Sequence, residues 1–474
     1  MHLFQVNSKT PTCHGIKNLI LISCFACTIY FLYPFILVPN SNFLDHNSII
    51  SHGQLYDSSS SITLQNVVFG IASNCKSWSK RKEYVKLWWN PKEMRGYVFL
   101  EKKLPNTSTN DSILLPPICI SKDISRFPYT NKGGNPSAIR VARVVSETVT
   151  LHLNHSNVKW FVFGDDDTIF FQENLVKTLS KYDSGLWYYI GSNSESFIQN
   201  KFFSFEMAFG GAGFAISYPL AKAIEKIQDK CIQKYPHLYG SDDRIQACMA
   251  EFGVPLTKEV GFHQFDLHGS VTGLLSAHPV APVISLHHLD KIKPIFPKVS
   301  RVEALRRLNK PIKLDSAGLM QQSICYDRPR GWTISVSWGY SVQINRGILP
   351  ARDIEKPTRT FNDWYGTGNE NSFTFNTRQF HKNGCQRPFY YMLSNAYVTT
   401  NHTTSVYVHD EAPRRKCKWR MADPSGIRHV QVYKKPDPNL WDKSPRRNCC
   451  RILPTSKNGS LLVDVGECRD GETI

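Results

Sequence analysis

The chain has 474 residues, of which 41% are hydrophobic, enough for one large domain with an extension or for two domains. Its formal net charge of +18 favours anionic partners such as nucleotide phosphates, acidic glycans or lipid headgroups. The sequence has no dense Lys/Arg tract and no zinc-finger or RNA-binding signature, so we expect no nucleic-acid partner.

An uncharged apolar segment at 18–38 has the length of a membrane-spanning helix. Lys9 and Lys17 precede it, and the next basic residue after it is Lys76, so the positive-inside rule places the remainder of the chain in the lumen. We therefore expect a cytosolic tail at 1–17, a transmembrane signal-anchor at 18–38 and a Ser/Asn-rich stem at 39–64. The protein would then be membrane-anchored, single-pass and of type II, with its main domain in the lumen.

Ten cysteines and five N-x-S/T sequons follow the apolar segment. An even number of cysteines in an oxidising lumen favours disulfides, although the sequence does not specify their pairing. Free buried thiols in a reducing compartment are the alternative. None of the cysteines forms a C-x-x-C zinc pattern.

Strands and helices alternate in the first half of the chain after the stem. Apolar runs predict strands at 65–73, 96–101, 160–164 and 187–191, and helical spacing predicts helices before Pro91, at 137–153 and around 173–180. This alternation predicts an α/β domain at 65–300 with a mainly parallel sheet, which binds ligands beyond the carboxyl ends of its strands. The alternating segment 334–344 predicts a strand and, with frequent Pro, Gly and Cys, a β-rich C-terminal module at 301–474.

Three adjacent aspartates, Asp165, Asp166 and Asp167, follow the apolar run WFVFG. In an extended backbone alternate side chains share a face, so Asp165 and Asp167 are expected to point together. Two carboxylates near 4 Å repel by about 1 kcal/mol in water, and a divalent cation reverses the sign. We therefore favour a Mn²⁺ or Mg²⁺ site over a solvated turn in which Asp167 caps the next helix. A phosphatase-type nucleophilic aspartate is disfavoured, because Ile169 stands four residues after Asp165.

Further candidate residues occur in three segments. Glycines at 210–213 allow close approach of the backbone to a ligand, or form a tight turn. Asp242 and Asp243 open a helix, as a general base or as capping residues. His287 and His288 offer a metal ligand, a phosphate contact or a structural histidine.

The order of these motifs, GDDDTIFF, GGAGFAIS, YGSDDRI and ISLHHLD, resembles Fringe and related β-1,3-glycosyltransferases, most closely the plant branch of Fringe-related proteins. The resemblance covers about residue 65 to the C-terminus, although animal Fringe offers little to compare with the region after 300. It implies a GT-A fold, a UDP-sugar donor, a glycan or glycoconjugate acceptor, Mn²⁺ (or Mg²⁺) as cofactor and a place in the Golgi membrane.

The resemblance also implies a role for each matching residue. The metal ligands would be Asp167, Asp165 and His288, although the choice between His287 and His288 is open. The base would be Asp243, a better match than Asp242. The donor-binding residues would be Asp165, Asp166, Ala72, Gly211, Ala212 and Gly213. For Ala72, tight packing is an equal alternative. Arg140 and Arg143 are candidate diphosphate partners, or lie on a solvated helix face.

The expected function is therefore that of a metal-dependent inverting glycosyltransferase, which moves a sugar from a UDP-sugar to a hydroxyl of a glycan or glycoconjugate and forms a β-1,3 linkage. The rival is a catalytically silent glycan-binding or complex-forming subunit of the same fold. A third reading, a metal-dependent hydrolase, requires an activated water in place of a sugar acceptor. The identity of the sugar and of the acceptor depends on contacts that a sequence does not show.

Overall fold

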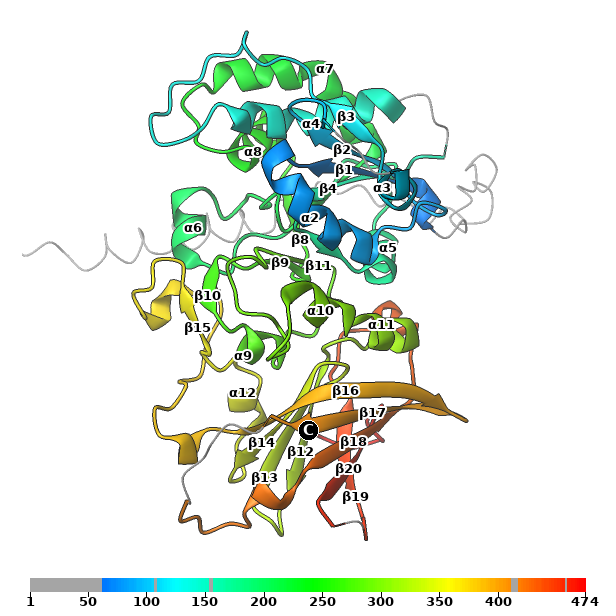
Figure 1. Cartoon of the computed structure of the whole chain (residues 1–474), viewed down its shortest axis with the longest axis vertical. Helices are drawn as coiled ribbons and strands as arrows, with labels where there is room; N and C mark the ends of the chain where they lie inside the picture. Colours follow the sequence, from blue (N-terminus) through cyan, green and yellow to red (C-terminus); the bar gives the residue numbers. More distant parts are fainter. Residues whose placement is uncertain (1–61, 106–108, 153–156, 411–416, 457) are drawn as a thin grey trace, which may run out of the picture. The chain divides into compact units, whose positions relative to one another are not determined.

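The computed structural model describes residues 62–474 apart from 106–108, 153–156, 411–416 and 457 (Figure 1). The chain from Ser61 to Ile474 forms one compact unit. The predicted tail and signal-anchor lie outside the described residues, as does almost all of the predicted stem. No helix within the described part is long and apolar enough to cross a membrane. The described residues therefore give no support to the predicted transmembrane helix or to the single-pass Golgi membrane location.

A seven-stranded sheet occupies the first half of the described chain. Its strand order is β3 (Ile118–Ile120), β2 (Arg95–Leu100), β1 (Val67–Ala72), β4 (Trp160–Asp165), β7 (Phe214–Ser217), β6 (Tyr189–Gly191) and β8 (Leu256–Lys258). All six residues of β1 are buried, as an apolar central strand requires, because both faces of the sheet are covered. Strands β1, β2 and β4 lie where the apolar runs predicted them.

Helices cover both faces of this sheet (Figure 1). One face is covered by α4 (Ser137–His152), α7 (Tyr218–Lys234) and α8 (Asp242–Glu251), which share a core with the sheet. The other carries α2 (Cys75–Trp88) and α5 (Gln172–Leu179), and the short helices α3 (Thr109–Leu114) and α6 (Phe197–Phe202) lie in connections. Asn74 caps α2, since its side chain accepts from the backbone N–H groups of Lys76 and Ser77.

The prediction of a mainly parallel α/β fold needs correction. Strand β7 runs antiparallel to both of its neighbours, β4 and β6, so the seven-stranded sheet is mixed. The largest sheet of the protein is a different one, with eight strands that pair antiparallel except for β18 and β20. Strand and helix alternation in the sequence indicates neither strand direction nor pairing partners, which long-range packing decides.

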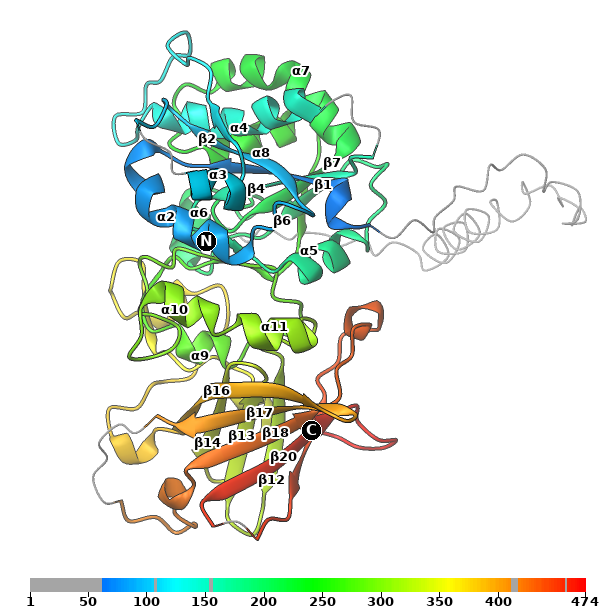
Figure 2. The ribbon, with the colours of Figure 1, turned by 45° about the vertical axis from the view of Figure 1, so that its right-hand side comes forward.

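The chain also forms two small sheets. One has the order β5 (Ile169–Phe170), β11 (Ser285–His287), β9 (Phe262–Gln264), and the other pairs β10 (Leu267–Gly269) with β15 (Phe361–Asp363). The connecting helices are α9 (Thr272–Leu275), α10 (Arg301–Arg306), α11 (Asn309–Asp315) and α12 (Ala351–Ile354). Figure 2 shows α10 and α11 between α2 and β16, where α10 contacts α2 and α11 contacts β16. A single apolar core runs from the α2 face into the eight-stranded sheet.

The eight-stranded sheet contains most of the predicted β-rich module. Its order is β12 (Gln322–Asp327), β13 (Trp332–Ser337), β14 (Ser341–Arg346), β16 (Phe389–Thr399), β17 (His402–His409), β18 (His429–Lys434), β20 (Ser460–Gly466) and β19 (Cys449–Leu453). The single strand predicted at 334–344 is instead the hairpin β13–β14, because the chain turns at Gly339 with φ = 74°. The Tyr407 hydroxyl accepts from the Gly339 N–H at 2.8 Å, which ties the turn to β17.

Eight of the ten cysteines after the apolar segment form disulfides, as an oxidising compartment predicts. The pairs are Cys231–Cys248, Cys325–Cys450, Cys385–Cys417 and Cys449–Cys468. Cys75 and Cys119 are free thiols. The second pair joins β12 to β19, the two ends of the eight-stranded sheet.

Candidate functional site

The triple-aspartate motif lies at the carboxyl end of β4, beside the end of β1. Asp165 is the last residue of β4 and pairs in register with Ala72, so Ala72 lies against the motif. The Asp166 N–H donates to the Ala72 carbonyl at 3.0 Å. The Thr168 N–H donates to the Asp165 carbonyl at 3.1 Å, which closes a turn. The backbone turns at the motif and does not stay extended, but Asp165 and Asp167 point to one place, as predicted.

Asp166 points into a polar anchor between β4 and α2. Its Oδ2 accepts from the hydroxyls of Ser73 at 2.6 Å and Ser77 at 2.7 Å. Its Oδ1 accepts from the Arg81 guanidinium at 3.0 Å. Burial raises the pKa of Asp166, and the two hydroxyl donors oppose the rise. Because partners from the chain itself occupy both oxygens, Asp166 serves to position α2 against the motif.

Arg81 is the positive charge that the aspartates meet. Its Nη1 lies 3.0 Å from Asp166 Oδ1, and its Nη2 lies 3.1 Å from Asp167 Oδ2. Its Nε lies 3.0 Å from Oδ2 of Asp290, which also accepts from the Tyr84 hydroxyl at 2.7 Å. Sequence reasoning placed Arg81 in a basic helix without giving it a role. The available signal was its spacing of three or four residues from other polar side chains of α2, which puts them on one helix face.

Asp165, Asp167 and His287 form a cluster in which one candidate ligand atom from each lies within 4.8 Å of the others. His287, the last residue of β11, has its Nε2 3.2 Å from Asp167 Oδ1 and 3.7 Å from Asp165 Oδ2. The side chains of Asp167 and His287 are buried, whereas that of Asp165 is 37% exposed. The cluster is therefore held by the protein interior and open to solvent on the Asp165 side.

Hydrogen bonds decide which nitrogen of His287 carries the proton. The Gln264 amide donates from Nε2 to Asp266 Oδ1 at 3.0 Å, which leaves its Oε1 to accept from His287 Nδ1 at 2.9 Å. Burial, reinforced by the ring of His288, lowers the pKa of His287, so the ring is neutral at pH 7. Its Nε2 then holds a lone pair that faces the carboxylates. Gln264 and Asp266 were not predicted from the sequence.

The charges of the cluster fit a divalent cation. Burial and then the charge of Asp167 raise the pKa of Asp165 well above its ordinary range. Burial also acts to raise the pKa of Asp167, but the charge of Arg81 acts in the opposite direction, and the pKa lies below its ordinary range. Two carboxylates and an imidazole lone pair that face one another repel unless a cation lies among them. Oxygen ligands with one imidazole suit Mn²⁺ or Mg²⁺, and the bond from Nδ1 to Gln264 is the outer support that metal-binding histidines usually have.

His288, to which the resemblance gave the metal role, lies outside this cluster. Its backbone has φ = 62°, a conformation that residues other than glycine rarely adopt. Its Nδ1 lies 2.8 Å from Asp266 Oδ1. The rings of His287 and His288 stack with centroids 4.2 Å apart. His287, and not His288, is therefore the histidine that faces the aspartates.

Trp364 flanks the cluster and was missed in the sequence. It follows β15, and its ring stacks on His288 with centroids 5.4 Å apart and on His268 with centroids 5.2 Å apart. Asp363 holds the loop, since it accepts from the N–H groups of Tyr365 at 3.1 Å and Gly368 at 2.8 Å. The loop belongs to the region predicted as a separate module, and the pairing of β15 with β10 brings it to the cluster. A single tryptophan in the sequence does not indicate such a long-range contact.

The glycines of the GGAGF segment pack against the protein's own side chains. A Cβ on Gly211 would lie 2.0 Å from the ring of His287, so the ring can approach only because Gly211 has no side chain. Gly213 has φ = 89°, and a Cβ there would lie 2.7 Å from Phe170. Ala212 between them is fully buried. The close approach predicted for Gly211, Ala212 and Gly213 is thus made to His287 and Phe170.

Asp243, the predicted base, is occupied by the start of its own helix. Its carboxylate accepts from the N–H groups of Tyr239 at 2.8 Å and Gly240 at 3.1 Å. Arg244 Nη1 lies 3.8 Å from Asp243 Oδ1. This is the capping role that the sequence left as the alternative.

Asp242 is the member of the pair that lies toward the cluster. A Cβ on Gly210 would lie 2.6 Å from Asp242 Oδ1, while the next residue, Gly211, abuts His287. The charge of Asp242 is also among those that raise the pKa of Asp165. Burial raises the pKa of Asp242 itself to about 6, although the Gly210 N–H lowers it. A carboxylate with this pKa beside a cation site suits a general base.

The two arginines of α4 are buried and do not reach the cluster. Arg140 donates to the carbonyls of Ser73 at 2.7 Å and Phe99 at 3.3 Å. Arg143 donates to Asp229 at 2.9 Å. The solvated helix face that the sequence offered as the alternative is therefore not found, because both side chains are buried. Arg140 instead supports the carboxyl ends of β1 and β2.

Comparison with curated proteins gives no match. The model of the family described as "Protein of unknown function, DUF604" matches residues 199–450, just over half of the chain. The matched span contains Gly211, Asp242, His287 and Trp364, whereas the aspartates of β4 and Arg81 precede it. The chain belongs to this DUF604 family.

Proposed function

We propose that the protein is a metal-dependent inverting glycosyltransferase that moves a sugar from a UDP-sugar to a hydroxyl of a glycan or glycoconjugate. The observation that carries this proposal is the neutral imidazole of His287 facing Asp165 and Asp167. The resemblance of the motif order to Fringe-related β-1,3-glycosyltransferases supports the donor class and a β-1,3 linkage.

Asp165, Asp167 and His287 are the residues that would hold Mn²⁺ or Mg²⁺. When bound, such an ion neutralises the charge that develops on a diphosphate leaving group. Arg81 keeps Asp167 in place through its guanidinium, and the Nδ1–H of His287 is held by Gln264. The protein thus orients all three ligands from its own interior, which favours a site built for binding over a chance cluster of charges.

Asp242 is the proposed general base. In a single displacement the acceptor oxygen forms a bond to the anomeric carbon while the bond from that carbon to the UDP oxygen breaks. The electron pair of the broken bond leaves with UDP, and the acceptor proton passes to the Asp242 carboxylate. Positive charge gathers at the anomeric carbon, as in glycoside hydrolysis. One base is enough for inversion, because the leaving group needs no proton from the protein.

UDP release from several UDP-sugars, with a set of glycan acceptors and with or without Mn²⁺, tests the proposal. We expect release that requires both Mn²⁺ and acceptor. Asp242→Asn should bind UDP and Mn²⁺ but lower turnover by a factor of about 10² to 10⁴, the usual contribution of a general base. Asp243→Asn is the matched control and should retain most of the turnover.

Loss of turnover in Asp243→Asn with full turnover in Asp242→Asn would reverse the assignment of the base. Silence with every donor and acceptor, together with retained glycan binding, would favour the alternative of a non-catalytic glycan-binding subunit.

A further inference from the structure

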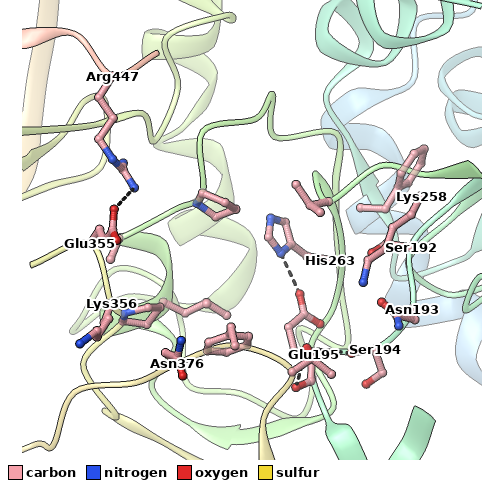
Figure 3. A pocket seen from close by; sticks show the side chains of 18 of the residues that line it. Ser192, Asn193, Ser194, Glu195, Lys258, His263, Glu355, Lys356, Asn376 and Arg447 are labelled. Atoms are coloured by element: carbon pink, nitrogen blue, oxygen red, sulfur yellow. Dashed lines mark hydrogen bonds and ion pairs between the residues drawn. The ribbon is translucent and has the colours of Figure 1, made fainter. Parts of the chain in front are cut away.

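A second cavity of about 420 Å³ lies apart from the aspartate cluster (Figure 3). Its lining comes from segments far apart in the sequence, including 192–195 after β6, 258–263 around β9, 352–357 around α12, 374–376 and Arg447. Strand β9 separates the two sites: Gln264 reaches His287 of the cluster, whereas the adjacent His263 reaches Glu195 of the cavity. This volume is within the range of cavities that bind small ligands.

A directed chain of hydrogen bonds ends in the wall of this cavity. The Pro279 carbonyl can only accept, so His278 Nδ1 at 2.7 Å is its donor, and His278 Nε2 is an acceptor in the neutral ring. His263 Nε2, 2.8 Å from His278 Nε2, must then donate, which leaves His263 Nδ1 to accept from Glu195 Oε1 at 2.8 Å. Burial lowers the pKa of His263 to about 4 and raises the pKa of Glu195 to about 8, in agreement with this direction. Glu195 is thus a neutral carboxylic acid.

Two buried polar atoms at the cavity lack hydrogen-bond partners among the described residues. One is Glu195 Oε2, an acceptor on a residue that is 8% exposed. The other is Arg447 Nη1, a donor on a side chain that is 11% exposed and whose Nη2 is 4.0 Å from Glu355 Oε2. Buried polar atoms without partners are rare in folded proteins, so each indicates a missing partner. The missing partner of Glu195 is a donor and that of Arg447 is an acceptor.

The charge around the cavity is positive. Lys258, Arg352, Lys356 and Arg447 line it, together with Glu355 and the neutral Glu195. Lys356 is also paired with Asp353 at 2.8 Å, and the remaining cations outnumber the acids. A guanidinium with a free N–H beside further cations favours a carboxylate or phosphate group. Apolar side chains, among them Phe375, complete the wall.

We propose that this cavity binds a monosaccharide unit that carries an anionic group, either a carboxylate or a phosphate. The anionic group lies at Arg447 and a sugar hydroxyl donates to Glu195 Oε2, because these two atoms need opposite partners. The apolar wall with Phe375 contacts the carbon face of the sugar ring. This site is independent of the proposed transferase reaction, since it shares no side chain with the aspartate cluster.

Calorimetric titration of the full chain with D-glucuronate, D-glucose 6-phosphate and D-glucose at one ionic strength tests the proposal. We expect saturable binding of at least one of the two anions and binding of D-glucose that is weaker by about tenfold or more. The comparison of the two anions tells a carboxylate site from a phosphate site. Arg447→Gln should weaken binding of the anion by about tenfold or more, and Arg352→Gln should weaken it to a smaller extent. Arg328→Gln, a change at an exposed arginine outside the cavity, should bind as the wild type does.

Equal affinity for D-glucose and both anions, or no saturable binding of any of the three, would overturn the proposal. Thermal unfolding shows whether Arg447→Gln folds. If it does not, anion binding by Arg352→Gln that equals that of the wild type would overturn the proposal. The anion should also bind equally to Asp167→Ala, because the cavity does not use the cluster. Loss of binding in Asp167→Ala would place the sugar at the aspartates and contradict the inference without touching the proposed transferase activity.

Discussion

His287 Nε2 lies 3.2 Å from Asp167 Oδ1, and in the neutral ring both atoms carry lone pairs. Such a pair is stable only with a positive charge close by. Arg81 supplies part of that charge, since its Nη1 donates to Asp167 Oδ1 at 3.2 Å and its Nη2 lies 3.1 Å from Asp167 Oδ2. The open side of Asp165 is where a divalent cation would supply the rest.

Removing either member of this pair should weaken cation binding. We expect Asp167→Ala and His287→Ala to weaken Mn²⁺ affinity at least tenfold, because each deletes a ligand and leaves the remaining acceptors unsupported. Electron paramagnetic resonance of free Mn²⁺ during a titration measures this. His288→Ala is the matched control and should keep Mn²⁺ affinity within a few-fold, since its ring faces Asp266. A greater loss in His288→Ala than in His287→Ala would contradict the assignment.

Arg81→Met should destabilise the protein. It leaves Asp166 and Asp167 without their main positive partner, and because Arg81 is partly exposed, we expect a loss of about 1–3 kcal/mol in the free energy of unfolding. Urea unfolding with and without Mn²⁺ measures it, and Mn²⁺ should restore part of the loss. Lys80→Met, at an exposed position of the same helix, should change the stability little. An Arg81→Met protein as stable as wild type would show that the ion pairs do not hold α2 to the motif.

Gly211→Ala should displace the His287 ring, because the added Cβ would lie 2.0 Å from it. We expect a destabilisation of about 1–3 kcal/mol, typical of overpacking, and weakened Mn²⁺ binding. Thermal unfolding and the same Mn²⁺ titration measure the two effects. Gly384→Ala is the control, since a Cβ there meets nothing within 4 Å. Wild-type Mn²⁺ affinity in Gly211→Ala would argue against the tight packing of the two residues.

Glu195→Gln should change how stability depends on pH. The fold raises the pKa of Glu195 from 4.5 to about 8, so its stabilising contribution is full below pH 4.5 and is lost as the pH rises toward 8. Glutamine keeps a donor for His263 and an acceptor for the cavity but does not titrate. The free energy of unfolding of the variant minus that of the wild type should therefore increase by about 2–4 kcal/mol between pH 5 and pH 8.

Urea unfolding at several pH values measures this difference, and the contributions of His263 and His278, which are shared by both proteins, largely cancel. A difference that stays constant with pH would show that Glu195 is ionised in the native state. A difference that falls as the pH rises would contradict the direction of the hydrogen-bond chain.

Several elements of the site could be predicted from local pattern. Strand β4 and the acids at its end follow from an apolar run that stops at charge, and α4 and α5 follow from helical spacing. The capping role of Asp243 was open as an alternative because acids at a helix start are stabilised there. The direction of β7 could not be predicted, since antiparallel and parallel pairing of a short buried strand leave the same apolar pattern.

The sequence by itself determined which chemistry the protein has available: clustered carboxylates beyond a strand, a histidine pair, a glycine-rich segment and enough cysteines for disulfides. Only the tertiary structure decided which members of each set meet. It placed His287 and not His288 at the aspartates, turned Asp242 and not Asp243 toward them, and brought Arg81 and Trp364 to the same place from distant segments. The physical reason is that the backbone directs the side chains of adjacent residues to different sides. Which side faces the site, and which distant segments reach it, depends on how strands and helices pack.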